Sequence, residues 1–210
     1  DQVAAGADLG FRADSSALVL VARRGDTLHL FDGIECRPED GRPLSLEETF
    51  DSFRRILTAR RCGYVLADQH FRDAMYEALG KHDIAVAPAQ QTPADRYVRA
   101  RVLLRGQKVK IHALGFRERL MRQLREVHGK PTSGGGMSIQ HPRWATGGHG
   151  DIADAFVLAL WQFGGDTVSA NKPVIGTPEW DEALRDQRRR EFLAERQERA
   201  TDWRVRYGLR

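Results

Sequence analysis

The stretch at residues 6–21 constrains the fold most, because it predicts two strands joined by a polar turn. The first strand ends in Asp8 and Gly10, and the second is a run of Leu and Val. An aspartate at this point is held by the sheet on one side and faces an open turn on the other. That position suits a metal ligand. The alternative interpretation is that Asp8 only caps the turn through its own backbone.

More strands are predicted before the first helix. Apolar runs at 17–23 and 27–32 flank Arg24-Gly25-Asp26, a pattern typical of a hairpin. Three antiparallel strands therefore come first. A capping box, Ser45 with Glu48, then opens a helix that extends through Arg60. Its expected buried face consists of Leu46, Phe50, Phe53 and Leu57.

A second short apolar run also finishes on an acid, at residues 64–68. Because the chain reaches it through a helix, we expect this strand to lie beside the first strand and parallel to it. Asp8 and Asp68 would then lie at the same edge of neighbouring strands. Open α/β sheets bind their ligands at that edge.

The middle of the chain predicts a helix at 71–81, a parallel strand at 84–88 and a helix from Thr92. A short basic strand at 108–112 and an amphipathic helix at 116–128 follow. The helix from Thr92 carries four arginines, and the simplest interpretation is a solvated charged face. These arginines are Arg96, Arg99, Arg101 and Arg105.

A glycine-rich segment at 133–148 predicts a hairpin or loop hinged on glycine, before an apolar helix at 149–161. The first turn of that helix holds Asp151 and Asp154, whose spacing places them on one face. A favourable interaction with the helix dipole is common enough to explain one of them.

Asp8, Asp68 and Asp151 thus come from three separate elements and predict a site for hard divalent cations. Carboxylates so close together repel one another unless a cation offsets their charge. Two such cations support phosphodiester hydrolysis, and Asp8, the most central of the three acids, would contact both.

The composition sets the broad class. The chain has 210 residues and a net charge of +4, which fits a polyanionic partner without demanding one. Cys36 and Cys62 lack the CxxC spacing, which favours a reducing compartment and gives no zinc signal. No signal peptide, membrane span or phosphate-binding loop is predicted. We expect one domain at residues 1–165, a linker and charged helical tail at 166–210, and a longer parent protein.

Three motifs together resemble the nuclease domain of the large terminase subunit of tailed bacteriophages, in the ribonuclease H-like superfamily. They are Gly6-Ala7-Asp8-Leu9-Gly10 with Asp14, the glycine hairpin at 134–139, and the segment at 149–155. The resemblance covers residues 3–161. It implies an α/β fold, in which a mixed sheet of three antiparallel strands followed by parallel strands is flanked by helices, with a late glycine-rich hairpin.

The resemblance also implies a function. The chain would be a metal-dependent endonuclease that cuts double-stranded viral DNA concatemers during genome packaging, with two Mg²⁺ or Mn²⁺ ions and little sequence specificity. Asp8, Asp68 and Asp151 match the catalytic triad, and Asp14 and Asp154 match nearby acids that would also bind metal. The expected DNA contacts are Lys130, His141, Arg143 and His149.

Partners follow from the same resemblance. The expected ones are double-stranded DNA, the packaging ATPase domain of the same full-length protein, the portal and the small terminase subunit. The expected location is the cytoplasm of the infected bacterial host. Three alternatives stay open: another ribonuclease H-like enzyme such as a resolvase, transposase or hybrid-specific ribonuclease; a noncatalytic portal-binding module; and a small-molecule-binding α/β domain with a chance array of acids.

Overall fold

The computed structural model describes residues 2–10, 15–38, 42–68, 72–132, 136–142 and 150–163. The expected linker and tail at 166–210 lie outside these residues, as do Asp14, Arg143 and His149. Within the described ranges, no helix is both long enough and apolar enough to span a membrane.

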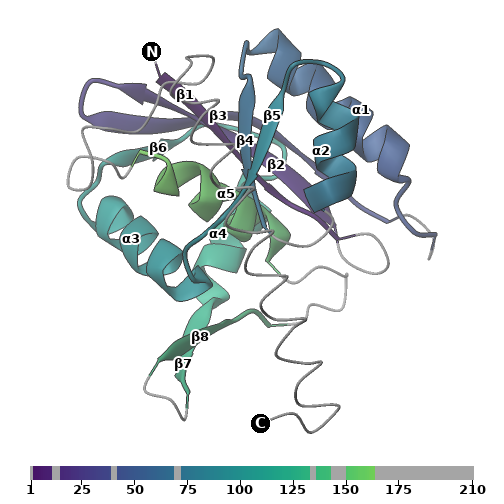
Figure 1. Ribbon diagram of the computed structural model, residues 1–210. Helices are drawn as coiled ribbons and strands as arrows, with labels where there is room; N and C mark the ends of the chain where they lie inside the picture. The colour runs from purple at the N-terminus through teal and green to yellow at the C-terminus, as the bar shows by residue number, and fades with distance from the viewer. Residues whose placement is uncertain are drawn as a thin grey trace, which may run out of the picture. The chain divides into compact units, whose positions relative to one another are not determined.

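A mixed sheet organises the fold, with its six strands in the order β5-β4-β1-β2-β3-β6 (Figure 1). β1, β2 and β3 form an antiparallel meander, whereas β4, β5 and β6 each run parallel to the strand beside which they lie. The strands of this sheet are β1 (Gln2–Asp8), β2 (Ser16–Arg24), β3 (Thr27–Cys36), β4 (Tyr64–Ala67), β5 (Ala85–Pro88) and β6 (Val109–Ile111). The predicted meander followed by parallel strands is therefore confirmed.

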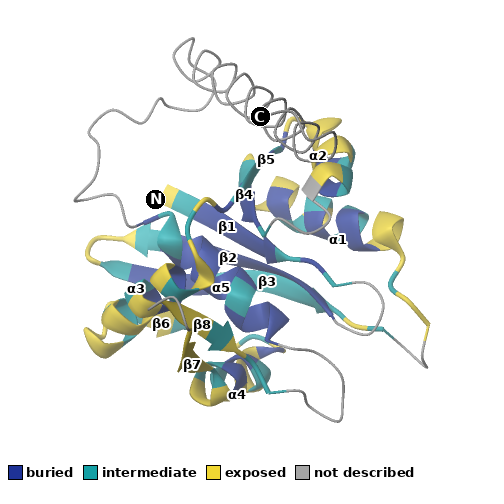
Figure 2. Ribbon diagram, turned by 60° about the horizontal axis from the view of Figure 1, so that its bottom comes forward, coloured by how far each residue is buried: buried dark blue, intermediate teal, exposed yellow. Residues whose placement is uncertain are grey.

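Helices cover both faces of the sheet. They are α1 (Leu46–Ala59), α2 (Arg72–Gly80), α3 (Pro93–Arg105), α4 (Arg117–Glu126) and α5 (Asp151–Trp161). α1 and α2 bury Phe53 and Met75 against one face, together with Leu18 of β2. The other face packs Val19 against Leu120 of α4 and Phe156 of α5. Figure 2 shows the central strands buried between these layers.

A separate hairpin, β7 (His128–Pro131) with β8 (Met137–Gln140), lies outside the main sheet. Most of its residues are exposed, as the yellow ribbon in Figure 2 shows. The sequence placed a hairpin here but started it among the glycines, and it extended the preceding helix to residue 128. The structure corrects both boundaries, because α4 ends at Glu126 and the next residues pair with β8.

Gly6 sets how closely α5 approaches the sheet. A Cβ atom at this position would lie 2.1 Å from the backbone oxygen of Ala155 and 2.5 Å from the backbone nitrogen of Ala159. Only a residue without a side chain allows this contact, so α5 rests directly on β1. Its first turn is thereby held beside the end of β1, where Asp8 lies.

Ser45 caps α1 as expected, since the Glu48 N–H donates to Ser45 Oγ at 3.3 Å. Phe50, Phe53 and Leu57 form the buried face. Leu46 was also expected there, but it is 40% exposed at the first position of the helix. Thr49 is buried in its stead.

Candidate metal and phosphate site

Asp8 and Asp68 meet where two parallel strands end. Ala7 of β1 pairs with Ala67 of β4, so the next residue of each strand is an aspartate at the same sheet edge. The Asp68 N–H donates to the Ala7 carbonyl at 3.3 Å and continues the ladder by one residue. The predicted juxtaposition of Asp8 and Asp68 is therefore present.

Asp8 also caps its own turn, as the alternative interpretation proposed. The Leu9 N–H donates to Asp8 Oδ1 at 3.1 Å. Among the described residues this is the one hydrogen bond that the Asp8 carboxylate accepts, and an ionised carboxylate offers about four lone-pair sites. Turn capping and ligand binding are thus compatible at Asp8.

The start of α5 supplies a third acid. α5 begins at Asp151, and Gly150 before it adopts the left-handed backbone with φ of 111°. A Cβ atom on Gly150 would lie 2.2 Å from His141 Nδ1, so glycine lets the imidazole approach the helix start. A buried glutamine of α4 stabilises that start, because the Ala153 N–H donates to Gln123 Oε1 at 3.0 Å.

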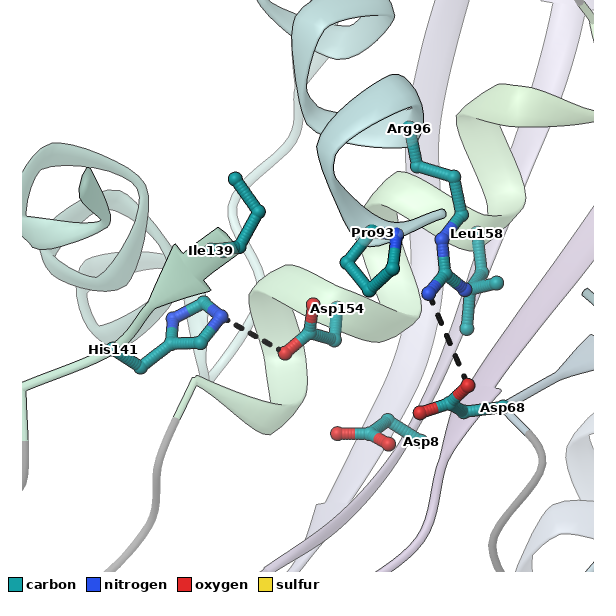
Figure 3. A pocket seen from close by; sticks show the side chains of 8 residues that line it. All are labelled: Asp8, Asp68, Pro93, Arg96, Ile139, His141, Asp154 and Leu158. Atoms are coloured by element: carbon teal, nitrogen blue, oxygen red, sulfur yellow. Dashed lines mark ion pairs between the residues drawn. The ribbon is translucent and has the colours of Figure 1, made fainter. Parts of the chain in front are cut away.

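These elements enclose a pocket of about 180 Å³ (Figure 3). Carboxylates from β1, the end of β4 and α5 converge on it from three sides, with one guanidinium and one imidazole. The lining residues are Asp8, Asp68, Pro93, Arg96, Ile139, His141, Asp154 and Leu158. Convergence from elements far apart in the sequence marks the pocket as the candidate functional site.

Charge repulsion shapes the chemistry of Asp8. Burial raises the pKa of this carboxyl well above its usual value, and the charges of Asp154, Asp151 and Asp68 raise it further. The Leu9 hydrogen bond lowers the pKa but does not reverse the shift. An acid in this state favours either a proton or a cation, since both relieve the same repulsion.

His141 links the hairpin to α5. Its Nε2 lies 3.1 Å from Asp154 Oδ2 and 3.4 Å from the Tyr97 hydroxyl oxygen. Burial raises the pKa of Tyr97 well above its usual value, and the charge of Asp154 adds to the shift. Tyr97 therefore stays protonated and can donate a hydrogen bond. His141 and Tyr97 together orient the carboxylate of Asp154 toward the pocket.

Asp151 takes a different position from Asp154. It is 5% exposed and is not among the residues that line the pocket. Its Oδ2 accepts hydrogen bonds from the Ser15 N–H, at 3.2 Å, and from the Ser15 hydroxyl. The same hydroxyl contacts Glu35, which pairs with Arg119 of α4. Asp151 is near enough to Asp8 for its charge to raise the pKa of Asp8, but Asp154 is the α5 acid that lines the pocket.

Arg96 is the residue that the sequence interpretation missed. It was expected on a solvated face, but it is only 6% exposed and its guanidinium lies 3.9 Å from Asp68 Oδ1. The expectation was wrong because the N-terminal half of α3 packs against α5, which buries Arg96, Tyr97 and Ala100. The combination of Thr92 and Pro93 was the available signal, since it fixes where the helix starts and which face turns inward.

The remaining predicted site residues are spread more widely. Lys130 is exposed on β7, outside the pocket. Asp14, Arg143 and His149 lie in segments outside the described ranges, so their expected roles stay predictions.

The carboxylates match a hard divalent cation in chemistry. Oxygen donors are what Mg²⁺ and Mn²⁺ prefer, and a bound cation would offset the repulsion that, after burial, raises the pKa of Asp8. In the described ranges, no three His, Cys, Asp or Glu side chains are gathered tightly enough to hold an ion as they stand.

Comparisons with known proteins bear on the fold. No family model matches the sequence, and no curated protein sequence matches it. Among solved structures, the large terminase nuclease from thermophilic phage G20c is similar, with 18% identity and a TM-score of 0.60 over 76% of this chain and 81% of that one. A second structure of that nuclease has bound magnesium.

Two further structures are similar. One is the g2p large terminase nuclease domain from bacteriophage SPP1 with bound Mn, at 18% identity and a TM-score of 0.55, over 78% of this chain and 87% of that one. The other is the large terminase of bacteriophage HK97, at 14% identity and a TM-score of 0.59. It matches 76% of this chain, which spans only 39% of the HK97 protein. The chain therefore has the fold of large terminase nuclease domains, and the resemblance stated from the sequence is confirmed at that level.

Proposed function

We propose that this chain is a metal-dependent endonuclease that cuts double-stranded DNA, and that it serves as the nuclease part of a viral genome-packaging protein. One observation carries the proposal. Asp8, Asp68 and Asp154 converge from β1, the end of β4 and α5 on one pocket. The fold is shared with nuclease domains that were solved with bound magnesium and bound Mn.

The acids divide into two groups in this proposal. Asp8, Asp68 and Asp154 would hold divalent cations, because their carboxylates line the pocket. Asp151 would act as a positioning residue, because its carboxylate is buried and accepts two hydrogen bonds from Ser15. Bound Mg²⁺ or Mn²⁺ would supply a nucleophilic water near neutral pH and neutralise charge that develops on the phosphate.

The reaction is hydrolysis of one phosphodiester bond. The oxygen of a water molecule forms a bond to phosphorus, and the bond between phosphorus and the 3′ oxygen breaks. The 3′ oxygen takes a proton, so the products carry a 5′-phosphate and a 3′-hydroxyl. His141 is placed to hold Asp154 in orientation, since its Nε2 lies 3.1 Å from Asp154 Oδ2.

The exposed hairpin extends the site toward DNA. Lys130 is exposed on β7, and His141 follows β8 directly into the pocket wall. We include Arg143 and His149 of the following segment as further backbone contacts on sequence grounds. These side chains would contact the phosphates of the DNA backbone and not the bases. Binding would therefore be weakly sequence-specific and strongly salt-dependent.

Partners belong to the same proposal. A similar large terminase, from a thermophilic bacteriophage, was solved in complex with ATP-gamma-S, and this chain spans only 38% of it. That difference in length supports a packaging ATPase domain elsewhere in the same full-length protein. The portal and the small terminase subunit would be the other partners, and concatemeric viral DNA in the host cytoplasm would be the substrate.

Cleavage of supercoiled plasmid tests the proposal. The protein is incubated with Mg²⁺, Mn²⁺, Ca²⁺ or EDTA, and nicked and linear products are measured for wild type and for Asn variants of four acids. We expect Mn²⁺ or Mg²⁺ to support cutting and EDTA to abolish it. The variants Asp8→Asn, Asp68→Asn and Asp154→Asn should be inactive, whereas Asp151→Asn should retain a measurable fraction of activity.

Asp26→Asn is the matched control, because Asp26 is exposed in the turn between β2 and β3, at the opposite end of β2. It should cut like wild type. A folded wild-type protein that cuts no DNA with any metal contradicts the nuclease proposal and favours a noncatalytic packaging module. If Asp151→Asn is inactive and Asp154→Asn is fully active, then Asp151 and not Asp154 is the third catalytic acid.

A further inference from the structure

Among the described residues that line the pocket, Arg96 is the one permanent cation. It belongs to the first turns of α3, whose start is fixed by Pro93 and by Thr92, which accepts a hydrogen bond from the Asp95 N–H. The side chain is 6% exposed, and Figure 3 shows the guanidinium reaching past Pro93 and Leu158 toward Asp68. A buried guanidinium is costly unless its charge and its donors are used.

The contact between Arg96 and Asp68 is an ion pair without a hydrogen bond from the guanidinium N–H groups. The distance between Arg96 Nη2 and Asp68 Oδ1 is 3.9 Å, which is within ion-pair range but too long for a hydrogen bond. The planar guanidinium carries five N–H donors in a fixed fork. At least one edge of that fork therefore faces the pocket without a hydrogen bond to Asp68.

The balance of acidic and basic groups in the pocket also indicates that the Arg96 guanidinium is available to a ligand. Among the described residues that line the pocket, the three carboxyl groups of Asp8, Asp68 and Asp154 outnumber the one guanidinium, that of Arg96. A bound divalent cation would offset this excess of acidic groups. A cation bound by Asp68 would compete with Arg96 for that carboxylate, and a phosphate oxygen would then be a suitable acceptor for the guanidinium N–H groups.

We propose that Arg96 pairs with Asp68 in the resting pocket and donates hydrogen bonds to the nonbridging oxygens of the scissile phosphodiester when DNA is bound. This inference rests on the nuclease function proposed above and adds a substrate-contacting residue to it. The guanidinium geometry suits two phosphate oxygens at once, which an ammonium group cannot match.

Single-turnover cleavage of a saturating DNA duplex in Mn²⁺ tests the inference. Arg96→Gln should lower the rate by about 100-fold or more, the loss typical of removing one donor to a developing oxyanion. Arg96→Lys should recover only part of the rate, because it restores the charge without the fork. Arg101→Gln is the matched control, since Arg101 is exposed on the same helix and should cut like wild type.

Calorimetric titration with Mn²⁺ alone gives an independent readout. Removing the positive charge beside Asp68 should leave the Mn²⁺ affinity of Arg96→Gln equal to that of wild type or severalfold tighter. If Arg96→Gln cuts within about threefold of wild type, the phosphate contact is absent. If instead its Mn²⁺ affinity falls and excess Mn²⁺ restores its rate, Arg96 only holds the carboxylates, and the inference is overturned.

The two proposals fail separately. A wild-type protein that binds Mn²⁺ but cuts no duplex refutes the nuclease function and the phosphate role of Arg96. Its Mn²⁺ titration still reports whether Arg96 competes with the cation for Asp68. A wild-type protein that cuts while Arg96→Gln cuts equally well refutes the Arg96 inference alone.

Discussion

Replacing Gly6 by alanine tests whether the contact between α5 and β1 builds the site. A Cβ atom there would lie 2.1 Å from the Ala155 carbonyl oxygen, and an ordinary contact is at least 3.4 Å. The helix must therefore retreat by about 3.4 minus 2.1, or 1.3 Å, because the opposing atoms are backbone and cannot rotate away. Overpacking of this kind costs about 1–3 kcal/mol. We expect the upper end, about 3 kcal/mol, for a clash with backbone.

Thermal unfolding and single-turnover cleavage measure the two consequences. A loss of about 3 kcal/mol lowers the Tm of a unit this size by roughly 6–12 °C. Because Asp154 moves with α5, the cleavage rate should also fall by about 100-fold at temperatures where the variant is folded. Gly80→Ala is the control, since a Cβ atom at Gly80 meets nothing within 4 Å. A Gly6→Ala variant with wild-type Tm and wild-type rate would show that α5 does not rest on β1.

Two other measurements examine groups whose pKa the fold shifts. The folded pKa of Asp8 is raised above the unfolded value of about 3.9, so the folded state binds more protons between the two values and stability falls as pH rises through that window. Asp8→Asn, which lacks this charge, should therefore have a higher Tm than wild type at neutral pH in EDTA, and a lower Tm contradicts the reasoning. Burial also raises the pKa of the Cys62 thiol. In a Cys36→Ala background, iodoacetamide should label Cys62 slowly in the native protein and quickly in denaturant; equal rates would mean that Cys62 is accessible.

The sheet could be predicted from sequence because its signals are local. Apolar runs, a hairpin turn and a capping box each act within a few residues, and the parallel crossover then places Asp68 beside Asp8. The boundary between α4 and β7 was wrong because Val127 continues the helical apolar pattern while His128 already pairs with Gln140. Strand pairing across a glycine-rich loop is a tertiary effect, which the local pattern does not contain.

The burial of Arg96 could not be predicted for a related reason. Arginine is usually exposed, so four arginines on one helix favour a solvated face. The other three are exposed or only partly buried, but the close contact between α3 and α5 turns Arg96 inward. Whether Arg96 is buried therefore depends on α5, a helix that begins some fifty residues later in the chain, at Asp151.

Which of Asp151 and Asp154 lines the pocket also depends on tertiary contacts that the local sequence does not contain. Both acids belong to the first turn of α5, and their spacing alone assigns them to one face. Across the sheet, Asp8 pairs with Ala17 and Ala17 pairs with Glu35, so Glu35 points to the same face of the sheet as Asp8. There Glu35 pairs with Arg119, and its Oε1 lies 3.2 Å from the Ser15 hydroxyl oxygen.

The Ser15 N–H donates to Asp151 Oδ2, and the Ser15 hydroxyl contacts the same oxygen. A carboxylate that already accepts two buried hydrogen bonds has less capacity to bind a cation than one whose oxygens face an open pocket. Asp154 has only His141 as its ion-pair partner within the described residues, and its side chain is 28% exposed. The pairing of β1, β2 and β3 therefore brings Glu35 close to Ser15 and Asp151, whereas Asp154 lines the pocket with Asp8 and Asp68.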